Sequence, residues 1–460
     1  MKMTFRGALL CASIASCLIL FSCSKNDSSS DPSSNPPKDS VVTPVVNSIS
    51  PSHGTATTSV TIYGAGFSEF VTQDSVLFNG VKAVLVSASK TQIVAKVPLG
   101  CGTGKITVYC NGTQITGPVF TYDPSYVVSL LAGSGNMGFT NGTGAAASFW
   151  GLGDVVTDAS GNVYVTEMGN HTIRKITPDG VVTTLAGGLG TGAEDGTGID
   201  AHFYNVKGIA IDAAGTLYVC DDGNYIIRKI TLSGVVTTLT SGGYGFADGP
   251  GATAKFSTVE GIAVDKNGNV YVCDAGNNRI RKITPAGVVS TLAGTGVPGG
   301  NDGPGASATF NAPIDVAVDI SGNVYVTENS RKQFYNNVYY PGNNKIRKIT
   351  PDGTVSTFAG SGAVGATNGN GAAASFNDPG GLCFDSNGNL YVTEVSGNSI
   401  RKITPNGDVT TVAGSISAGA TNGTIDVATF KNPVGIAADN NGNLYVADFG
   451  NVMIRKLSLK

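Results

Sequence analysis

An aromatic-rich segment interrupts an otherwise periodic sequence between residues 330 and 341. It reads Ser-Arg-Lys-Gln-Phe-Tyr-Asn-Asn-Val-Tyr-Tyr-Pro and combines four aromatic rings, two cations and three amides. Rings stack on apolar faces, while amides and a guanidinium satisfy hydroxyls or carboxylates, so this composition suits a sugar or a peptide. The alternative is a loop whose rings pack on their own part of the fold. The residues predicted to bind a ligand are Arg331, Phe334, Tyr335, Tyr339 and Tyr340.

Four further candidates lie at positions of a repeated unit where the residue type changes from one unit to the next. Trp150 is the only tryptophan of the chain, and Tyr204 takes the matching place one unit later. Lys207 and Glu260 lie in neighbouring units, where a simple ion pair is favoured over a catalytic pair. We predict that all four belong to the ligand-binding surface, together with the aromatic-rich segment.

Residues able to support catalysis are few. Asp154, Glu260 and Asp315 carry oxygen ligands that suit a hard cation, provided that the fold brings them together. The three histidines lack a recognisable metal-ligand spacing, and the sequence contains no G-x-S-x-G, H-E-x-x-H or P-loop motif. We therefore predict no catalytic residue, no metal ligand and no cofactor. A metal-dependent hydrolase or lyase stays open as an alternative.

The segment Gly-Asn-x-x-Ile-Arg-Lys-Ile-Thr recurs six times with small variations and sets the organisation of the chain. Successive Arg-Lys pairs are 54, 53, 66, 54 and 54 residues apart, and the longest interval contains the aromatic-rich segment. A carboxylate precedes every Arg, which favours an ion pair inside each unit over six active sites. The arginines are Arg174, Arg228, Arg281, Arg347, Arg401 and Arg455, and the carboxylates are Glu167, Asp221, Asp274, Glu328, Glu394 and Asp448.

Each unit is predicted to contain four short β-strands. Segments rich in β-branched and aromatic residues are separated by Asp-x-x-Gly-Asn and Pro-x-Gly turns. The last unit stops at Lys460 after three strands, whereas an unmatched strand at 127–133 precedes the first unit. An open ring would leave two exposed sheet edges, so we expect the unmatched strand to complete the last sheet. The sequence thus predicts an all-β chain with a six-bladed β-propeller over 126–460, closed by N- and C-terminal strands in one blade.

The repeated unit closely resembles the NHL repeat. It is clearest as Phe-Ser-Thr-Val-Glu-Gly-Ile-Ala-Val-Asp at 256–265, followed by Gly-Asn-Val-Tyr-Val-Cys-Asp at 268–274. The resemblance covers residues 126–460 and implies four-stranded propeller blades. The Phe that opens each unit is expected to be an apolar plug between blades. Some NHL proteins bind RNA. A formal net charge of −3 and the export signal expected at residues 1–22 argue against nucleic acid as a partner here.

Residues 44–123 form a separate unit of short alternating strands with Gly, Asn and Pro turns. Its stretches Ile-Ser-Pro-Ser-His-Gly, Val-Thr-Ile-Tyr-Gly-Ala-Gly-Phe and Val-Leu-Phe-Asn-Gly-Val resemble the IPT/TIG family of immunoglobulin-like domains. The resemblance implies a β-sandwich, which we interpret as a spacer between a membrane and the propeller. Cys101 and Cys110 lie largely along one expected strand and are too far apart for a disulfide, so we predict free thiols.

The first residues have the features of an export signal. Lys2 and Arg6 precede a short apolar run, and Leu-Phe-Ser-Cys at 20–23 resembles a bacterial lipobox. The resemblance implies that residues 1–22 are removed and that Cys23 is lipidated; an ordinary signal peptide with a chance cysteine is the alternative. Ser, Asp, Pro, Asn and Lys dominate residues 23–43, a composition typical of a flexible tether.

Together these features predict a non-catalytic lipoprotein of the cell envelope, anchored at the outer membrane and exposed on the cell surface. Its expected partner is a carbohydrate or a protein ligand, with a glycan preferred, and it contacts the membrane only through the lipid. The alternatives are a scaffold for a protein partner in an envelope complex and the metal-dependent enzyme.

Overall fold

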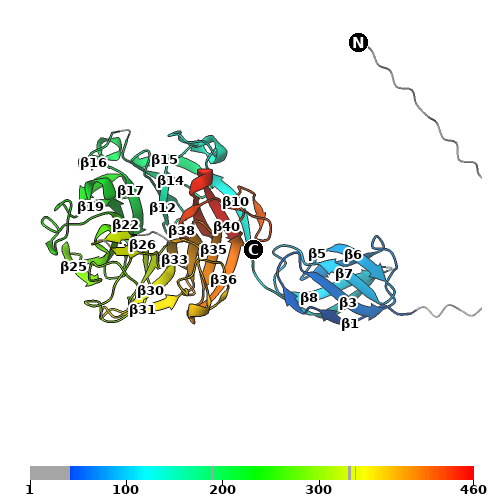
Figure 1. Cartoon of the computed structure of the whole chain (residues 1–460). Coiled ribbons are helices and arrows are strands. Elements are labelled where there is room, and N and C mark those ends of the chain that lie inside the picture. Colours follow the sequence, from blue (N-terminus) through cyan, green and yellow to red (C-terminus); the bar gives the residue numbers. More distant parts are fainter. Residues whose placement is uncertain (1–41, 111, 189, 330–332, 337) are drawn as a thin grey trace, which may run out of the picture.

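The computed structural model describes residues 42–110, 112–188, 190–329, 333–336 and 338–460. The predicted signal segment, the lipid anchor Cys23, nearly all of the tether, Arg331 and the side chains of Phe334, Tyr335 and Tyr339 lie outside this description. Every regular element in the described ranges is a β-strand or a single turn of 3-10 helix, which confirms the all-β class (Figure 1). None of these helical turns has the length and hydropathy needed to cross a bilayer.

The N-terminal part of the chain forms two sheets that share one core. The first sheet contains, in spatial order, β1 (Val45–Ser50), β3 (Ser59–Ala65), β7 (Gln92–Lys96) and β6 (Val84–Ser89). The second contains β2 (His53–Gly54), β9 (Thr113–Tyr122), β8 (Gly104–Cys110), β4 (Asp74–Phe78) and β5 (Val81–Lys82). Val60 of the first sheet belongs to the same buried cluster as Ile106 and Phe120 of the second. Cys101 and Cys110 are free thiols, as predicted.

The rest of the chain forms, within its described residues, six antiparallel sheets that we call blades 1 to 6. Blade 1 contains β12 (Leu152–Thr157), β13 (Val163–Glu167), β14 (Thr172–Ile176), β15 (Val181–Ala186) and β11 (Gly142–Thr143). Blade 2 contains β17 (Val206–Ile211), β18 (Leu217–Asp221), β19 (Ile226–Ile230), β20 (Val235–Thr238) and β16 (Gly196–Thr197). Blade 3 contains β22 (Val259–Val264), β23 (Val270–Asp274), β24 (Arg279–Ile283), β25 (Val288–Ala293) and β21 (Gly249–Pro250).

Blades 4 to 6 follow the same order, from the innermost strand outwards. Blade 4 contains β26 (Pro313–Val318), β27 (Val324–Glu328), β30 (Lys345–Ile349) and β31 (Val355–Ala359). Blade 5 contains β33 (Pro379–Phe384), β34 (Leu390–Glu394), β35 (Ser399–Ile403), β36 (Asp408–Gly414) and β32 (Gly369–Asn370). Blade 6 contains β38 (Pro433–Ala438), β39 (Leu444–Asp448), β40 (Met453–Leu459), β10 (Tyr126–Ala132) and β37 (Gly423–Thr424). The 3-10 turns are η1 (Gly144–Ala146), η2 (Gly198–Asp200), η3 (Asp222–Asn224), η4 (Ala275–Asn277), η5 (Gly371–Ala373) and η6 (Phe449–Asn451).

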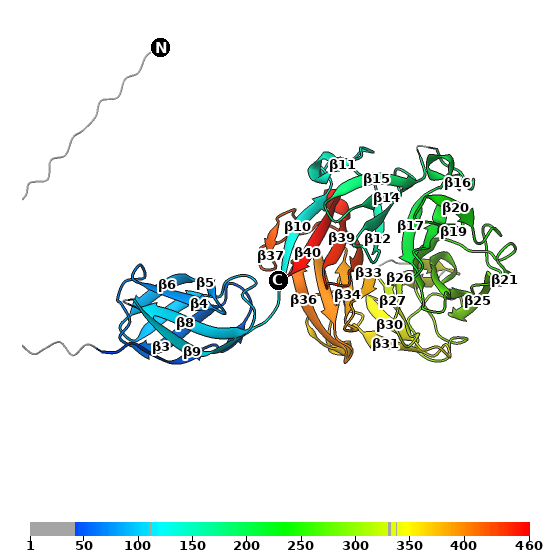
Figure 2. The ribbon, with the colours of Figure 1, turned by 180° about the vertical axis from the view of Figure 1, so that it is seen from behind.

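The innermost strands follow one another around a closed ring. β12 contacts β17, β17 contacts β22, and the contacts continue through β26, β33 and β38 back to β12 (Figure 1). Closure depends on β10, which pairs antiparallel with β40 so that Tyr126 lies opposite Leu459 (Figure 2). The strand that precedes the first repeat thus completes the sheet of the last one, and the ring has no open edge between blades 6 and 1.

The Phe that opens each repeat is fully buried between blades. Phe256 packs in one cluster with Ala210 and Cys220 of blade 2 and with Val259 of its own blade. Its ring also lies under the guanidinium of Arg281, 4.9 Å from the ring centroid. Apolar contacts between blades therefore supply the core of the ring, with a cation stacked on each plug. The plugs are Phe149, Phe203, Phe256, Phe310, Phe376 and Phe430.

Candidate functional site

Each innermost strand carries a bulge near its start. In blade 1 the pairing of β12 with β13 shifts between Leu152 and Val155, which leaves Gly153 and Asp154 outside the regular ladder. The same shift recurs in the other blades. A β-bulge redirects side chains and is common beside functional sites. The bulged pairs are Gly153-Asp154, Lys207-Gly208, Glu260-Gly261, Ile314-Asp315, Gly380-Gly381 and Val434-Gly435.

All of these bulge residues line one cavity of about 500 Å³, which we call the wide end of the channel. Met168, Asn329, Val395 and Phe449, which each follow the second strand of a blade, complete part of its wall. The wide end therefore opens on the face where the second strands end. A cavity of this size, with an apolar wall and a few placed polar groups, has the character of a small-molecule site.

A second cavity of about 260 Å³, the narrow end, is lined by the regular part of the same strands. Its wall carries apolar side chains such as Ile209, Ile262 and Val316. Asp154 and Asp315 contribute to the walls of both cavities. The two carboxylates therefore lie where the wide end meets the narrow end.

Asp154 and Asp315 belong to blades 1 and 4, which are three places apart in the ring. Each carboxylate reaches the next blade. Asp154 accepts a hydrogen bond from the backbone N–H of Ile209 at 3.3 Å, and Asp315 accepts one from that of Leu382 at 2.7 Å. Burial raises the pKa of Asp154 to about 7. Burial, and then the charge of Asp154, raise the pKa of Asp315 well above its ordinary value.

Glycine in the preceding blade makes room for each of these carboxylates. A Cβ on Gly435 would lie 2.6 Å from Asp154 Oδ1, and a Cβ on Gly261 would lie 2.1 Å from Asp315 Oδ1. Glycine at Gly435 and Gly261 is therefore a packing requirement, because a side chain there would collide with the carboxylate of the following blade.

A lysine bridges two carboxylates on one wall of the wide end. Lys207 Nζ lies 2.9 Å from Glu260 Oε1 and 2.9 Å from Asp222 Oδ2, and the three side chains are 18%, 9% and 10% exposed, respectively. Burial alone would lower the pKa of Lys207, but the charges of Glu260 and Asp222 outweigh it and raise that pKa. The predicted Lys207–Glu260 pair is thus present. Sequence reasoning missed Asp222, whose signal was a lone acidic residue where the other blades carry Met, Ala, Asn, Val or Phe after the second strand.

The predicted aromatic residues with described side chains, Trp150, Tyr204 and Tyr340, lie outside the wall of this cavity. Trp150 and Tyr204 are about half exposed on the loops of the face where the wide end opens. The aromatic-rich segment of blade 4 forms a hairpin of β28 (Gln333–Tyr335) and β29 (Val338–Tyr340), in which Gln333 pairs with Tyr340. None of its described residues lines the cavity. Among the predicted ligand-binding residues whose side chains the structure describes, Lys207 and Glu260 alone lie in the wall.

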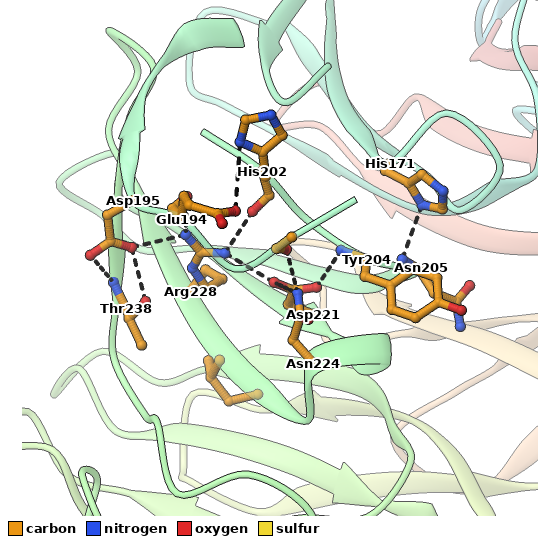
Figure 3. Close-up of polar contacts among 12 residues, drawn as sticks. His171, Glu194, Asp195, His202, Tyr204, Asn205, Asp221, Asn224, Arg228 and Thr238 are labelled. Carbon is orange, nitrogen blue, oxygen red and sulfur yellow. Dashed lines mark hydrogen bonds and ion pairs between the residues drawn. The ribbon is translucent and has the colours of Figure 1, made fainter. Parts of the chain in front are cut away.

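The arginines of the repeat are structural, as predicted. Figure 3 shows the arrangement in blade 2, where Arg228 donates to Asp221 at 3.0 Å and to Asp195 at 2.8 Å. It also donates to the backbone carbonyls of His202 and Glu194. Equivalent bonds hold the other five arginines, all of them fully buried. An Asp or Asn in the loop before each plug Phe is thus the second side-chain partner of each guanidinium.

The residues weighed for a metal give a mixed result. Asp154, Glu260 and Asp315 do converge on the wide end. Across the described part of the chain, however, no group of three or more His, Cys, Asp or Glu side chains has the arrangement of a metal site. His171 is instead engaged on the rim, where its Nδ1 accepts a hydrogen bond from the backbone N–H of Asn205 at 3.1 Å (Figure 3).

Family models match both parts of the chain. The IPT/TIG domain matches residues 44–122, and the NHL repeat matches residues 256–283, 376–403 and 430–456. The chain carries an IPT/TIG domain followed by NHL repeats. The matched NHL repeats run from the plug Phe through the third strand of blades 3, 5 and 6, so the bulge that lines the wide end lies inside the repeat.

Relatives in other organisms share the NHL region at low identity. The chain is 27% identical to the protein SUPPRESSOR OF QUENCHING 1, chloroplastic, of Arabidopsis thaliana, over 59% of this chain and 27% of that protein. It is 26% identical to NHL repeat-containing protein 2 of Gallus gallus, over 67% of this chain and 46% of that protein. The chain thus spans less than half of the length of either relative.

Solved structures from Bacteroides thetaiotaomicron share the fold over nearly the whole chain. A putative phosphatase superposes with a TM-score of 0.63 at 17% identity, covering 91% of this chain and 97% of that one. An auxiliary nutrient binding protein superposes with a TM-score of 0.60 at 18% identity, covering 90% and 97%. At these identities the similarity concerns the arrangement of both the N-terminal domain and the NHL region.

Proposed function

We propose that this protein is a non-catalytic, lipid-anchored binding protein of the outer membrane, with Cys23 as its anchor, that takes an extracellular glycan at the wide end of its channel. The observation that carries the proposal is the convergence of all the bulge residues on one open cavity of about 500 Å³. The first bulge residue differs between blades, and this variation brings charged and apolar side chains together in one place.

The chemistry of the wide end supports binding in preference to turnover. Lys207 is held between two carboxylates, and Asp154 and Asp315 are fixed by backbone N–H groups of neighbouring blades. These groups present a preorganised set of donors and acceptors to hydroxyl groups, beside apolar walls that suit sugar C–H faces. The raised pKa of Asp154, about 7, is a feature of the wide end that would instead suit a general acid or base.

Two similar structures add support from outside this chain. The auxiliary nutrient binding proteins of Bacteroides thetaiotaomicron and Bacteroides ovatus superpose with TM-scores of 0.60 and 0.58. Their names describe binding of a nutrient. An extracellular nutrient held by a membrane-anchored protein of the same architecture fits the proposed anchor, tether and open channel.

A glycan array probed with the full chain tests the proposal. We expect retention of one group of related glycans, and loss of that retention when Lys207 and Glu260 are replaced together by Met and Gln. An array without any retained glycan, combined with a co-purified protein at the propeller, would contradict the glycan and favour the scaffold.

An enzyme is a second candidate, because Asp154, Glu260 and Asp315 line the same cavity. Incubation of the array ligands with the protein and a divalent cation separates the two functions. Binding without any product supports the proposal, whereas metal-dependent turnover that is lost in Asp154→Asn would establish the enzyme.

A further inference from the structure

At three kinds of position on the face with the wide end, the aromatic rings of the described repeats gather in one half of the ring of blades. The first kind comprises the two residues on either side of a glycine in the loop before the plug Phe, such as Tyr244 and Phe246. The second is the residue directly after the plug. The third is the residue with a positive φ that follows the second strand. In blades 4 to 6 these positions carry Asn, Ala, Gly, Pro, Val and Lys. In blades 1 to 3 they supply the seven rings that we call the aromatic band: Phe139, Trp150, His171, Tyr204, Tyr225, Tyr244 and Phe246. A further ring, that of Phe449 in blade 6, lies in the wall of the wide end itself.

The loops that carry the band adjoin the wide end. The backbone carbonyl of Trp150 accepts a hydrogen bond from the N–H of Gly169 at 3.1 Å, and that of Tyr204 accepts one from Gly223 at 2.8 Å. Met168, next to Gly169, lines the wide end. The band therefore begins at the mouth of the cavity and lies on the same face.

Successive members of the band touch across blade boundaries. The rings of His171 in blade 1 and Tyr204 in blade 2 meet edge to face, with centroids 5.6 Å apart. The rings of Tyr225 in blade 2 and Tyr244, on the loop into blade 3, meet in the same way at 5.1 Å. Phe246 follows two residues later. The rings thus form two contacting pairs, one across the boundary between blades 1 and 2 and one across the boundary between blades 2 and 3.

The band combines exposure with a fixed backing. Trp150 is 50% exposed, Tyr204 47%, Tyr244 68% and Phe246 45%. Trp150 rests on Gly169, where an added Cβ would lie 2.6 Å from its Cδ2 atom. Rings that are held in place lose little conformational entropy on binding and offer flat apolar faces.

The aromatic band suits a chain of sugar rings as its ligand. Polar groups lie among the rings. His171 Nδ1 accepts a hydrogen bond from the backbone N–H of Asn205, and the guanidinium groups of Arg279 and Arg281 lie over the Phe246 ring, 3.9 Å and 4.9 Å from its centroid. A polysaccharide presents C–H faces to rings and hydroxyl groups to the polar groups between them. A folded protein partner would more commonly cover a contiguous apolar core with a closed polar rim.

We propose that the aromatic band is an extended subsite for an oligosaccharide chain, one part of which occupies the wide end while the rest runs over blades 1 to 3. This inference rests on the proposed function and narrows its ligand to a polymer with several stacking faces. A monosaccharide or disaccharide would fill the cavity and leave Tyr244 and Phe246 without a contact.

Calorimetric titration of the full chain with cello-, malto- and laminari-oligosaccharide ladders, from the disaccharide to the octasaccharide, tests the subsite. We expect affinity to rise with length in the ladder that binds. Replacing Tyr244 and Phe246 together by Ala should lower affinity for the octasaccharide by about tenfold and leave the disaccharide unchanged. Gly169→Ala displaces the Trp150 ring without removing it and should weaken binding of both. Tyr109→Ala, an exposed ring of the N-terminal domain, is the matched control.

The outcomes separate this inference from the proposed function. If short and long members of a ladder bind equally tightly, or if the Tyr244 and Phe246 replacements leave octasaccharide binding intact, the subsite is wrong while glycan binding at the wide end stands. If no ladder binds, and a co-purified protein instead protects the aromatic band from chemical labelling, both the subsite and the proposal of a glycan ligand are wrong.

Discussion

The wide and narrow ends of the channel are built from the same six strands, yet they differ in chemistry. At the wide end the bulges present Lys207, Glu260, Asp154 and Asp315 among glycines and apolar residues. At the narrow end, where the strands return to regular pairing, Val, Ile and Ala dominate the wall. The bulge residues are outside the ladder, and their residue types differ between blades more than those at the regular positions do. Within one repeat, therefore, the interruption of pairing separates the variable site from the constant scaffold.

The charged cluster of the wide end should contribute the largest effect. Lys207→Met leaves Asp222 and Glu260 with most of their surface buried and without their cation, so we expect the free energy of unfolding to fall by about 3 kcal/mol. Urea denaturation of the full chain, followed by circular dichroism, measures the change.

The narrow end supplies the control for this prediction. Thr157 Oγ1 donates a single hydrogen bond to the carbonyl of Ala438 at 2.9 Å. Thr157→Val should therefore cost only about 1 kcal/mol. Equal losses in Lys207→Met and Thr157→Val would show that the wide end is not electrostatically distinct.

The carboxylates at the junction should make stability depend on pH. Both pKa values are raised in the folded protein, so the stabilisation is complete below the unfolded pKa near 3.8 and is lost as the pH rises through the folded values, about 7 for Asp154. From about pH 4 to about pH 7, the unfolding free energy of the wild type should fall by about 1–3 kcal/mol relative to Asp154→Asn/Asp315→Asn. Denaturation midpoints of both proteins over this range measure it; parallel curves would rule out raised pKa values.

A smaller effect should come from the hydroxyl that ties a bulge to the next blade. Thr166 Oγ1 donates to the carbonyl of Lys207 at 2.5 Å and accepts a hydrogen bond from the N–H of Asp154 at 2.8 Å. Thr166→Val should cost about 1 kcal/mol in thermal or urea unfolding. In blade 2 the matching residue is Cys220, whose Sγ lies 3.9 Å from the carbonyl of Gly261. Cys220→Thr should raise the free energy of unfolding by a comparable amount. If it does not, the stabilising hydrogen bond to the next blade is limited to the blades that already carry Thr at this position.

The fold was readable because its signals are local and recur. The Arg-Lys pairs fixed the length of a unit, and the missing strand after Lys460 pointed to the pairing of β10 with β40 that the structure contains. The plug Phe and the ion pairs were also predictable, since a residue present in every unit most simply serves the architecture. These inferences needed only strand periodicity, turn residues and the cost of an open sheet edge.

The site was harder to read, because a register shift leaves no mark on residue type. The bulge made Lys207 and Glu260 neighbours of Asp154 and Asp315 across the channel, a relation that depends on ring geometry. Asp222 occupies the position after the second strand, where the residue type differs from blade to blade with no pattern that indicates a role. The role of the Thr that matches Cys220 was equally hidden, because its hydroxyl binds the neighbouring blade in three blades, a contact that residue type alone does not reveal.

The most direct test of the account is to fill one end of the channel at a time. Ile314 lines only the wide end and Thr157 only the narrow end. With the glycan selected on the array, calorimetry of Ile314→Trp should show an affinity lowered by about tenfold or more, because the indole occupies the cavity, whereas Thr157→Trp should bind like the wild type. Circular dichroism confirms that both variants are folded. Full affinity in Ile314→Trp, or a loss confined to Thr157→Trp, would contradict binding at the wide end.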